Sequence, residues 1–134
     1  MTEEECAARA LTNLGSSTNY AADGSQFMIQ YQDGAVDRNP EFYSWNHVFV
    51  MYCTGDLHFG SVAKPGPMQW GWAHFSGSLI VDSVVEDCKS MHGLGNATIV
   101  VWSGDSGGGI GSLASVDRVA SMVPSAKVFK AYSL

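Results

Sequence analysis

The chain has 134 residues, of which 46% are hydrophobic and 15% are charged, and its formal net charge is −6. This length fits one domain, and a charged fraction well below the usual quarter favours strands buried on both faces. With 7 Lys and Arg residues, the chain has no basic patch that could displace counterions, which disfavours nucleic-acid binding. No apolar run is long enough to cross a membrane.

The first half of the sequence predicts a helix, a loop, a strand and a second helix. Thr2 and Glu5 have the spacing of a capping box, which indicates a short helix from Thr2 to about Leu14. Residues 18–46 have little periodicity and many turn formers, so they are predicted to form a long loop. Residues 45–53 favour a buried strand, and an apolar period near 3.6 predicts a helix over residues 69–91.

The second half predicts a strand at residues 97–103, a helix to about Met122 and a further strand from Lys127. One apolar stripe of the helix is expected to face the core: Ile110, Leu113, Ala114, Val116, Val119, Ala120 and Val123. The order β, α, β, α, β predicts an α/β fold, with a mostly parallel sheet between two layers of helices. Three strands leave bare edges, so residues 1–134 are predicted to be the central, incomplete part of one domain.

The most informative motif is Gly104-Asp105-Ser106-Gly107-Gly108, between the predicted strand and the helix that follows it. Gly-x-Ser-x-Gly in a strand–turn–helix context is the pattern of a nucleophile elbow. The turn strains the backbone of the serine, and the glycines beside it let strand and helix approach closely. Ser106 is therefore a candidate nucleophile, and the N–H of Gly107 is a candidate donor to an oxyanion.

Other interpretations of this motif stay open. Gly-Asp-Ser-Gly-Gly also surrounds the nucleophile of trypsin-like proteases, whose upstream histidine has a close mimic here in His74. A phosphate-binding loop would need a lysine where this chain has Ile110, which disfavours that interpretation. The serine could also be passive, in a glycine-rich turn that only joins the strand to the helix.

Three cysteines, Cys6, Cys53 and Cys88, leave at least one thiol without a partner in the chain, and their spacing fits no zinc site. Either Cys53 and Cys88 are buried apolar residues, or the protein is extracellular and Cys6 pairs outside this chain. Asn96-Ala97-Thr98 is an N-glycosylation sequon, which matters only in a secreted protein. The N-terminus lacks the features of a signal peptide. No cofactor and no metal site is predicted.

Several segments, in the right order, resemble the pectin acetylesterase and Notum family of serine carboxylesterases, which belongs to the α/β-hydrolase superfamily. They are Cys6-x-x-Arg9-x-x-Thr12 with Leu14-Gly15-Ser16-Ser17, Asn39-Pro40-Glu41-Phe42-Tyr43 with Trp45-Asn46, Tyr52-Cys53, Phe75-Ser76-Gly77, and the motif around Ser106. The resemblance covers nearly the whole chain. Where the family has an alanine after the serine this chain has Gly107, which keeps the backbone N–H.

The resemblance implies a secreted hydrolase that removes an acyl group from a carbohydrate such as pectin, or from a lipid-modified protein. Ser106 would attack the ester carbonyl, the Gly107 N–H would hold the oxyanion, and water would release the acid. The substrate would be a small molecule or polysaccharide that carries an acyl ester. The alternatives are a non-catalytic, degenerate esterase-like binding module and a trypsin-like serine protease.

The chain also departs from the family. The Gly-Gly-Trp segment that completes the family's oxyanion hole is missing upstream, and the segment that follows Ser106 contains no histidine. Because α/β-hydrolases place the acid and the histidine after the serine, we expect little or no activity from this chain alone. Asp56 and His58 follow the first predicted strand at the edge where Ser106 lies. His58 is a candidate substitute base, and Trp70 is a candidate wall for the substrate.

Overall fold

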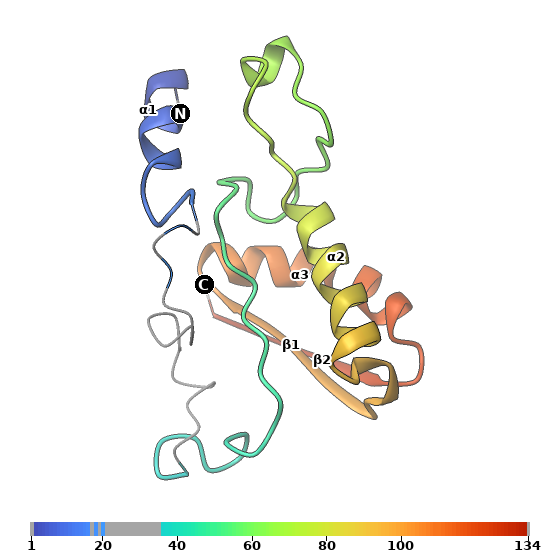
Figure 1. Cartoon of the computed structure of the whole chain (residues 1–134). Helices are drawn as coiled ribbons and strands as arrows, with labels where there is room; N and C mark the ends of the chain where they lie inside the picture. Colours follow the sequence, from blue (N-terminus) through green and yellow to red (C-terminus); the bar gives the residue numbers. More distant parts are fainter. Residues whose placement is uncertain (1, 17, 19, 21–35, 134) are drawn as a thin grey trace. The chain divides into compact units, whose positions relative to one another are not determined.

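The structure is a computed structural model that describes residues 2–16, 18, 20 and 36–133. The chain divides into two compact units, Met1–Cys53 and Thr54–Leu134 (Figure 1). In the described part of the first unit, helix α1 spans Glu3–Ala10. The second unit holds the remaining helices, both strands and every residue predicted for the functional site.

The capping box predicted for the first helix is confirmed. The Thr2 hydroxyl accepts a hydrogen bond from the Glu5 N–H at 3.2 Å, and the Glu5 carboxylate accepts one from the Thr2 N–H at 2.7 Å. The helix is shorter than predicted, because it ends at Ala10 rather than near Leu14. Of the long loop predicted for residues 18–46, residues 19 and 21–35 lie outside the described residues, and residues 36–46 form turns and irregular backbone as predicted.

The strand predicted for residues 45–53 is wrong. Residues 46–53 carry no strand assignment, and the sheet of the described chain consists of two other strands. The apolar side chains of this segment are also more exposed than predicted, with Val48 at 54% and Phe49 at 43%. An apolar run reports a tendency to be buried, and it does not by itself decide whether a segment joins a sheet.

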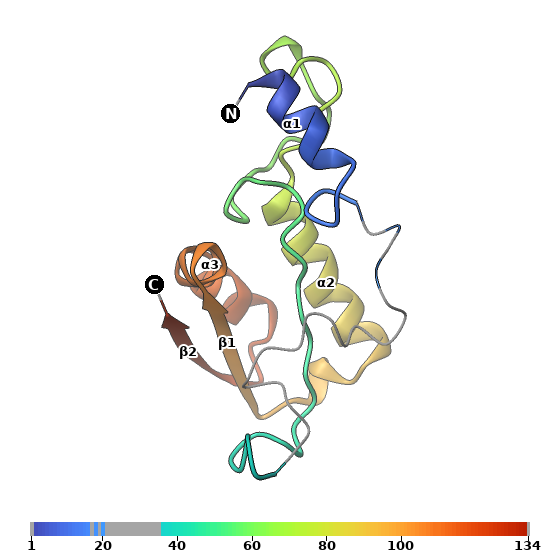
Figure 2. The same cartoon turned by 90° about the vertical axis from the view of Figure 1, so that its left-hand side faces the viewer.

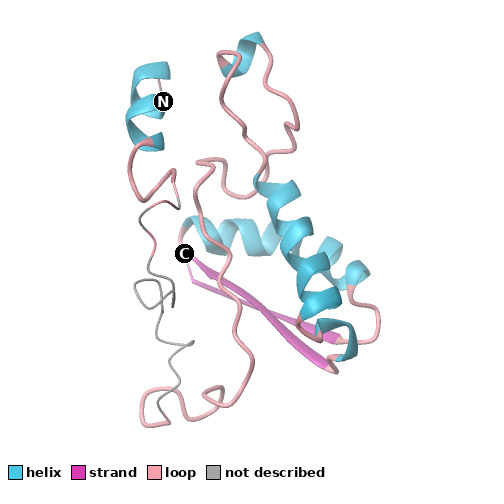
Figure 3. Ribbon diagram, viewed as in Figure 1, coloured by secondary structure: helices cyan, strands magenta, loops and turns pink. Residues whose placement is uncertain are grey.

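The second unit contains a parallel strand–helix–strand arrangement (Figure 3). Strand β1 (Ile99–Asp105) leads into helix α3 (Gly107–Met122), and strand β2 (Lys127–Ser133) returns beside β1. The register runs from Ile99 opposite Lys127 to Asp105 opposite Ser133. These elements lie close to their predicted positions, and they confirm an α/β fold with a parallel sheet. The short 3₁₀ turn η4 spans Leu94–Asn96, just before β1.

Helix α2 spans Gly77–Met91, so the helix predicted over residues 69–91 begins too early. A 3₁₀ turn, η3 (Pro67–Gln69), comes first, and the chain then leaves helical geometry. Trp70 and Gly71 have φ angles of 52° and 73°. A right-handed helix cannot continue through two left-handed residues, and residues 60–76 instead form a loop that projects beyond the start of α2 (Figures 1 and 2).

The core of the second unit lies between α2, α3 and the sheet. Its most deeply buried side chains are Val119 and Val123, each 1% exposed, and α2 contributes Val81, Val85 and Cys88. The stripe predicted for α3 is only partly right: Val119 and Val123 are buried, but Ile110 is 39% and Leu113 is 42% exposed. The buried side of the first half of α3 consists of small residues: Gly109, Gly111, Ser112 and Ser115.

Close packing explains this correction. Gly111, on the inner side of α3, has no room for a side chain, because an added Cβ would lie 2.8 Å from the Leu57 carbonyl oxygen, and the larger residues Ile110 and Leu113 lie outside. One polar contact ties helix to strand here, because the Trp102 indole N–H donates to the Ser115 hydroxyl at 2.9 Å. None of the helices formed by the described residues is long and apolar enough to cross a bilayer.

Candidate active site

Ser106 occupies the single residue between the end of β1 and the start of α3. Its backbone angles are φ 51° and ψ −122°, and its side chain is exposed. A positive φ in a residue with a Cβ is strained and costs about 1–3 kcal/mol. Figure 2 shows α3 close to the tip of β1, and the chain passes from strand to helix at this single residue. This is the geometry that the Gly-x-Ser-x-Gly motif predicts.

Gly104 makes this sharp turn possible. A Cβ atom on Gly104 would lie 2.1 Å from the Gly108 carbonyl oxygen and 2.3 Å from its carbonyl carbon. Both are backbone atoms, so they cannot rotate away as a side chain could. The first turn of α3 therefore rests directly on the backbone of β1, and this close approach sets the position of Ser106.

The Ser106 side chain does not do what a serine before a helix usually does. Such a serine normally adopts extended angles and accepts a hydrogen bond from the second or third helical N–H. Ser106 is left-handed in φ and makes no capping hydrogen bond. The amides of Gly107, Gly108 and Gly109 are thus left without a helical or capping partner at the positive end of the α3 dipole. The arrangement places anion-binding N–H groups beside an exposed hydroxyl.

Backbone strain at Ser106 leads to a direct prediction about stability. Ser106→Gly should raise the free energy of unfolding by about 1 kcal/mol. Glycine relieves a strain of about 1–3 kcal/mol, and this gain exceeds the cost of about 0.5–1 kcal/mol that comes from the greater entropy of glycine in the unfolded chain. Ser106→Ala keeps the Cβ and should bring no such gain. Urea unfolding of the two variants measures the difference. Equal stabilities would contradict the strain.

Asp56 lies at the centre of a cluster of hydrogen-bond donors. Its Oδ2 accepts from the N–H of Gly77 at 2.7 Å and from that of Gly60 at 3.1 Å. Its Oδ1 accepts from the N–H of His58 at 3.0 Å and from the Thr54 hydroxyl. Gly77 is the first residue of α2, and the adjacent Ser76 gives no side-chain cap. Asp56 therefore caps a helix that begins 21 residues later in the sequence.

His58, the predicted substitute base, is 9% exposed and lies against α3. A Cβ on Gly111 would lie 2.9 Å from the His58 Cδ2 atom, so the imidazole packs on the second turn of α3. Burial lowers the pKa of His58, and the charge of Asp56 opposes that shift more weakly. A general base acts through a neutral imidazole. The His58 ring, however, contacts Gly111, which lies more than one helical turn beyond Ser106.

Trp70, the predicted substrate wall, belongs to the loop between η3 and α2. Its ring stacks on that of Trp72, with the ring centroids 5.9 Å apart. It also makes an edge-to-face contact with Phe75, with the ring centroids 6.3 Å apart. Both partners come from the same loop, and Met68, two residues before Trp70, is 88% exposed. The structure thus joins Asp56 and His58 to α2 and α3, whereas the role of Trp70 stays a prediction.

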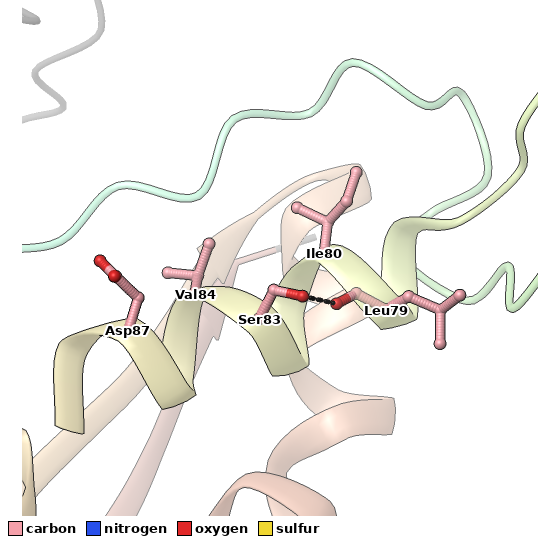
Figure 4. A pocket seen from close by; sticks show the side chains of 5 residues that line it. All are labelled: Leu79, Ile80, Ser83, Val84 and Asp87. Atoms are coloured by element: carbon pink, nitrogen blue, oxygen red, sulfur yellow. Dashed lines mark hydrogen bonds between the residues drawn. The ribbon is translucent and has the colours of Figure 1, made fainter. Parts of the chain in front are cut away.

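A shallow groove of about 360 Å³ lies on α2 (Figure 4). It is lined by Leu79, Ile80, Ser83, Val84 and Asp87, and the Ser83 hydroxyl donates to the Leu79 carbonyl oxygen at 2.8 Å. All of these residues come from one helix, and none of them is a predicted site residue. The groove is therefore separate from the turn that carries Ser106.

Sequence reasoning missed the glycines that let the predicted site residues pack together. A Cβ on Gly60 would lie 2.1 Å from the Phe75 carbonyl oxygen, and one on Gly77 would lie 2.3 Å from the Asp56 carboxylate. Part of the signal was present in the sequence. Thr54-Gly55-Asp56 is a turn-forming run, and Gly77 ends the Phe75-Ser76-Gly77 segment. The spacing alone could not show that these segments meet.

The parallel strands, the helix between them and the turn at Ser106 together form part of an α/β-hydrolase fold. The family model "PAE: Pectinacetylesterase" matches residues 1–133. The chain belongs to the pectinacetylesterase family. Membership of this family and the parallel pairing of β1 with β2 both contradict the alternative of a trypsin-like protease, because such proteases consist of β-barrels.

Relatives of two kinds are similar to the chain. Pectin acetylesterase 4 of Arabidopsis thaliana is 30% identical over 98% of this chain and 31% of its own length. Palmitoleoyl-protein carboxylesterase notum2 of Xenopus laevis is 41% identical over 65% of this chain and 17% of its own length. The chain thus spans less than a third of the curated relatives that it matches.

A solved structure of the Wnt deacylase Notum from Drosophila has the same fold. It superimposes with a TM-score of 0.82 over 96% of this chain and 39% of the other, at 21% sequence identity. At this identity the likeness concerns the fold alone. It confirms the predicted α/β class, and this chain corresponds to less than half of that larger structure.

Proposed function

We propose that this chain is the central part of a serine carboxylesterase domain and carries its nucleophile, with Ser106 as the attacking residue. The substrate class is an acyl ester, borne either by a polysaccharide, as the name of the Arabidopsis relative indicates, or by a protein, as that of the Xenopus relative indicates. An extracellular location is expected from the same resemblance. No metal or cofactor has a step in this proposal.

The backbone of Ser106 is the observation that supports the proposal most. A passive serine at a helix start would relax to extended angles and cap the helix, which stabilises a protein by about 1 kcal/mol. Ser106 instead has a φ angle of 51° and makes no cap. Strain of this kind persists where function requires it. The same angles leave the hydroxyl exposed beside the uncapped amides.

The proposed reaction proceeds in two steps. The Ser106 Oγ adds to the ester carbonyl carbon and loses its proton, and the carbonyl oxygen becomes an oxyanion beside the Gly107 N–H. The tetrahedral intermediate collapses, the C–O bond to the alcohol breaks, and the alcohol leaves with a proton. Water then adds to the acyl-serine and releases the carboxylic acid, which restores the hydroxyl.

Turnover by this chain should be slow. Both steps need a group that takes and returns a proton, and none of the four histidines of this chain follows Ser106. Loss of the general base costs several orders of magnitude in rate in serine hydrolases. Formation of a single covalent bond at Ser106 is therefore a better test than steady hydrolysis.

The test is labelling of the chain by a fluorophosphonate. The Ser106 oxygen should displace fluoride from phosphorus and add one phosphonyl group, which mass spectrometry of the peptides would locate. Ser106→Ala should lose at least 10³-fold in labelling rate, on the order of the effects seen when such nucleophiles are removed. Ser103→Ala is the matched control, since Ser103 is also exposed but belongs to β1.

Two results would contradict the proposal. Labelling that survives Ser106→Ala would place the reactive group elsewhere. A folded chain that takes up no label, even with imidazole added as an external base, would favour the non-catalytic binding module. Where labelling succeeds, the relative rates with p-nitrophenyl acetate and p-nitrophenyl octanoate would separate a short acyl group from a lipid-like one.

A further inference from the structure

The loop that follows Thr54 meets the start of α2 and the second turn of α3 around the Asp56 carboxylate. Three glycines make the meeting possible, because a Cβ on Gly60, Gly77 or Gly111 would lie within 2.9 Å of a neighbouring atom. For Gly60 and Gly111 the closest neighbours are backbone carbonyl oxygens, those of Phe75 and Leu57. The three segments are therefore in direct backbone contact, and we refer to this contact as the Asp56 junction.

Only a carboxylate suits the centre of the Asp56 junction. Each of its oxygens accepts two hydrogen bonds, so all four partners are donors: the N–H groups of His58, Gly60 and Gly77, and the Thr54 hydroxyl. An ionised Asp only accepts hydrogen bonds, which matches this set. An Asn of the same shape would turn an NH₂ group toward two donors, which leaves them unpaired.

These hydrogen bonds hold the next two residues in an unusual conformation. Leu57 and His58 have φ angles of 55° and 61°, and neither is a glycine. Two consecutive left-handed residues are unfavourable unless their surroundings fix them. The resulting turn directs the Leu57 carbonyl oxygen and the His58 ring onto Gly111, where an added Cβ would lie 2.8 and 2.9 Å from them.

Helix α3 is thereby held from two directions close to Ser106. Gly108 rests on Gly104 of β1, and Gly111 rests on Leu57 and His58. At a rise of about 1.5 Å per residue, Gly111 lies about 7.5 Å along the helix from Ser106. A shift of the second turn would change the position of the first turn and with it the strained serine.

We propose that Asp56 is a positioning residue for the nucleophile, acting through the contact of Leu57 and His58 with Gly111. This proposal rests on the proposed role of Ser106. Asp56 does not touch the substrate. It keeps the first turn of α3 against β1, so that the Ser106 hydroxyl and the amides that follow it hold a fixed relation to each other.

The first experiment compares Asp56→Asn with the unchanged chain in two measurements. The rate of fluorophosphonate labelling at Ser106 should fall at least tenfold. The amide of Ile110, which donates to the Ser106 carbonyl oxygen at 3.1 Å in the first turn of α3, should exchange hydrogen for deuterium faster. Asp82→Asn is the control, because it weakens the 3.1 Å ion pair between Asp82 of α2 and Arg118 of α3 and leaves the Asp56 junction intact. Its labelling rate should stay within twofold of that of the unchanged chain.

A second variant covers the case in which Asp56→Asn does not fold. Gly111→Ala leaves the carboxylate and its four donors in place and disturbs only the contact with α3. It should lower the labelling rate by a similar factor. If both variants fold, the double variant should lose less than the product of the two single losses, since both act through one contact.

The possible results separate this proposal from the proposed function. Folded Asp56→Asn or Gly111→Ala chains that label as fast as the unchanged chain would overturn the positioning role, with Ser106 still the nucleophile. If the unchanged chain takes up no label even with imidazole added as an external base, the proposed function fails, and the exchange rate of the Ile110 amide then decides the positioning role alone. Unchanged exchange in the variants would overturn it.

Discussion

Replacing Gly104 by alanine should destabilise the chain by about 3 kcal/mol and displace the start of α3. The added Cβ would lie 2.1 Å from the Gly108 carbonyl oxygen, and overpacking against atoms that cannot turn away costs about 1–3 kcal/mol or more. Strand and helix must separate to make room, and the strained angles of Ser106 relax when they do. Urea unfolding measures the first effect, and the labelling rate at Ser106 measures the second.

Gly108→Ala is the matched control for this prediction. A Cβ at Gly108 has nothing within 4 Å, although the two glycines are four residues apart and in contact with each other. Alanine is favoured over glycine in a helix by about 1 kcal/mol, so this variant should be neutral or slightly more stable. Equal losses at both positions would show that glycine is needed here for backbone freedom rather than for the close approach.

Placing a charge on either side of α3 should distinguish its buried face from its exposed one. Val119→Asp should lower the free energy of unfolding by about 4 kcal/mol or more, which is on the order of the largest single-residue effects. Val119 is 1% exposed, and the core between α2, α3 and the sheet surrounds it with apolar side chains. Leu113→Asp, on the same helix but 42% exposed, should cost less than about 1 kcal/mol in this chain.

Thermal unfolding of the two variants, followed by circular dichroism, checks the difference. The apolar stripe predicted from the sequence contains both residues, so the stripe alone would predict two similar losses. A large loss at Leu113 would mean that the outer side of α3 is covered in solution. A small loss at Val119 would mean that the helix is rotated from the orientation described above.

The strained turn at Ser106 could be predicted because its determinants are local. A β-branched run, a Gly-x-Ser-x-Gly motif and a helical period follow one another without a gap, and each is tied to the backbone geometry of its own segment. The structure places β1, α3 and β2 close to the predicted limits where these signals meet. Ser106 and Gly107 could be located by the same reasoning.

The Asp56 junction could not be predicted, since it joins residues that are far apart in the sequence. Asp56 and Gly77 are 21 residues apart, and nothing in either segment indicates that they form a hydrogen bond. Hydrophobic periodicity was only partly right on α3 for a related reason. It ranks side chains by their apolar character, whereas the close approach at Gly104 and Gly111 selects for small size.

The pairing of β1 with β2 also bears on the order in which this part of the chain folds. Ile99 lies opposite Lys127, so the ladder closes only after the whole of α3 has been synthesised and has folded back beside the strands. Helices form in about a microsecond, while parallel pairing waits for this longer closure. During synthesis and refolding, β1 and α3 are therefore present before β2 can pair with β1. The parallel sheet is thus a late product of folding, and the turn at Ser106 acquires its complete surroundings only then.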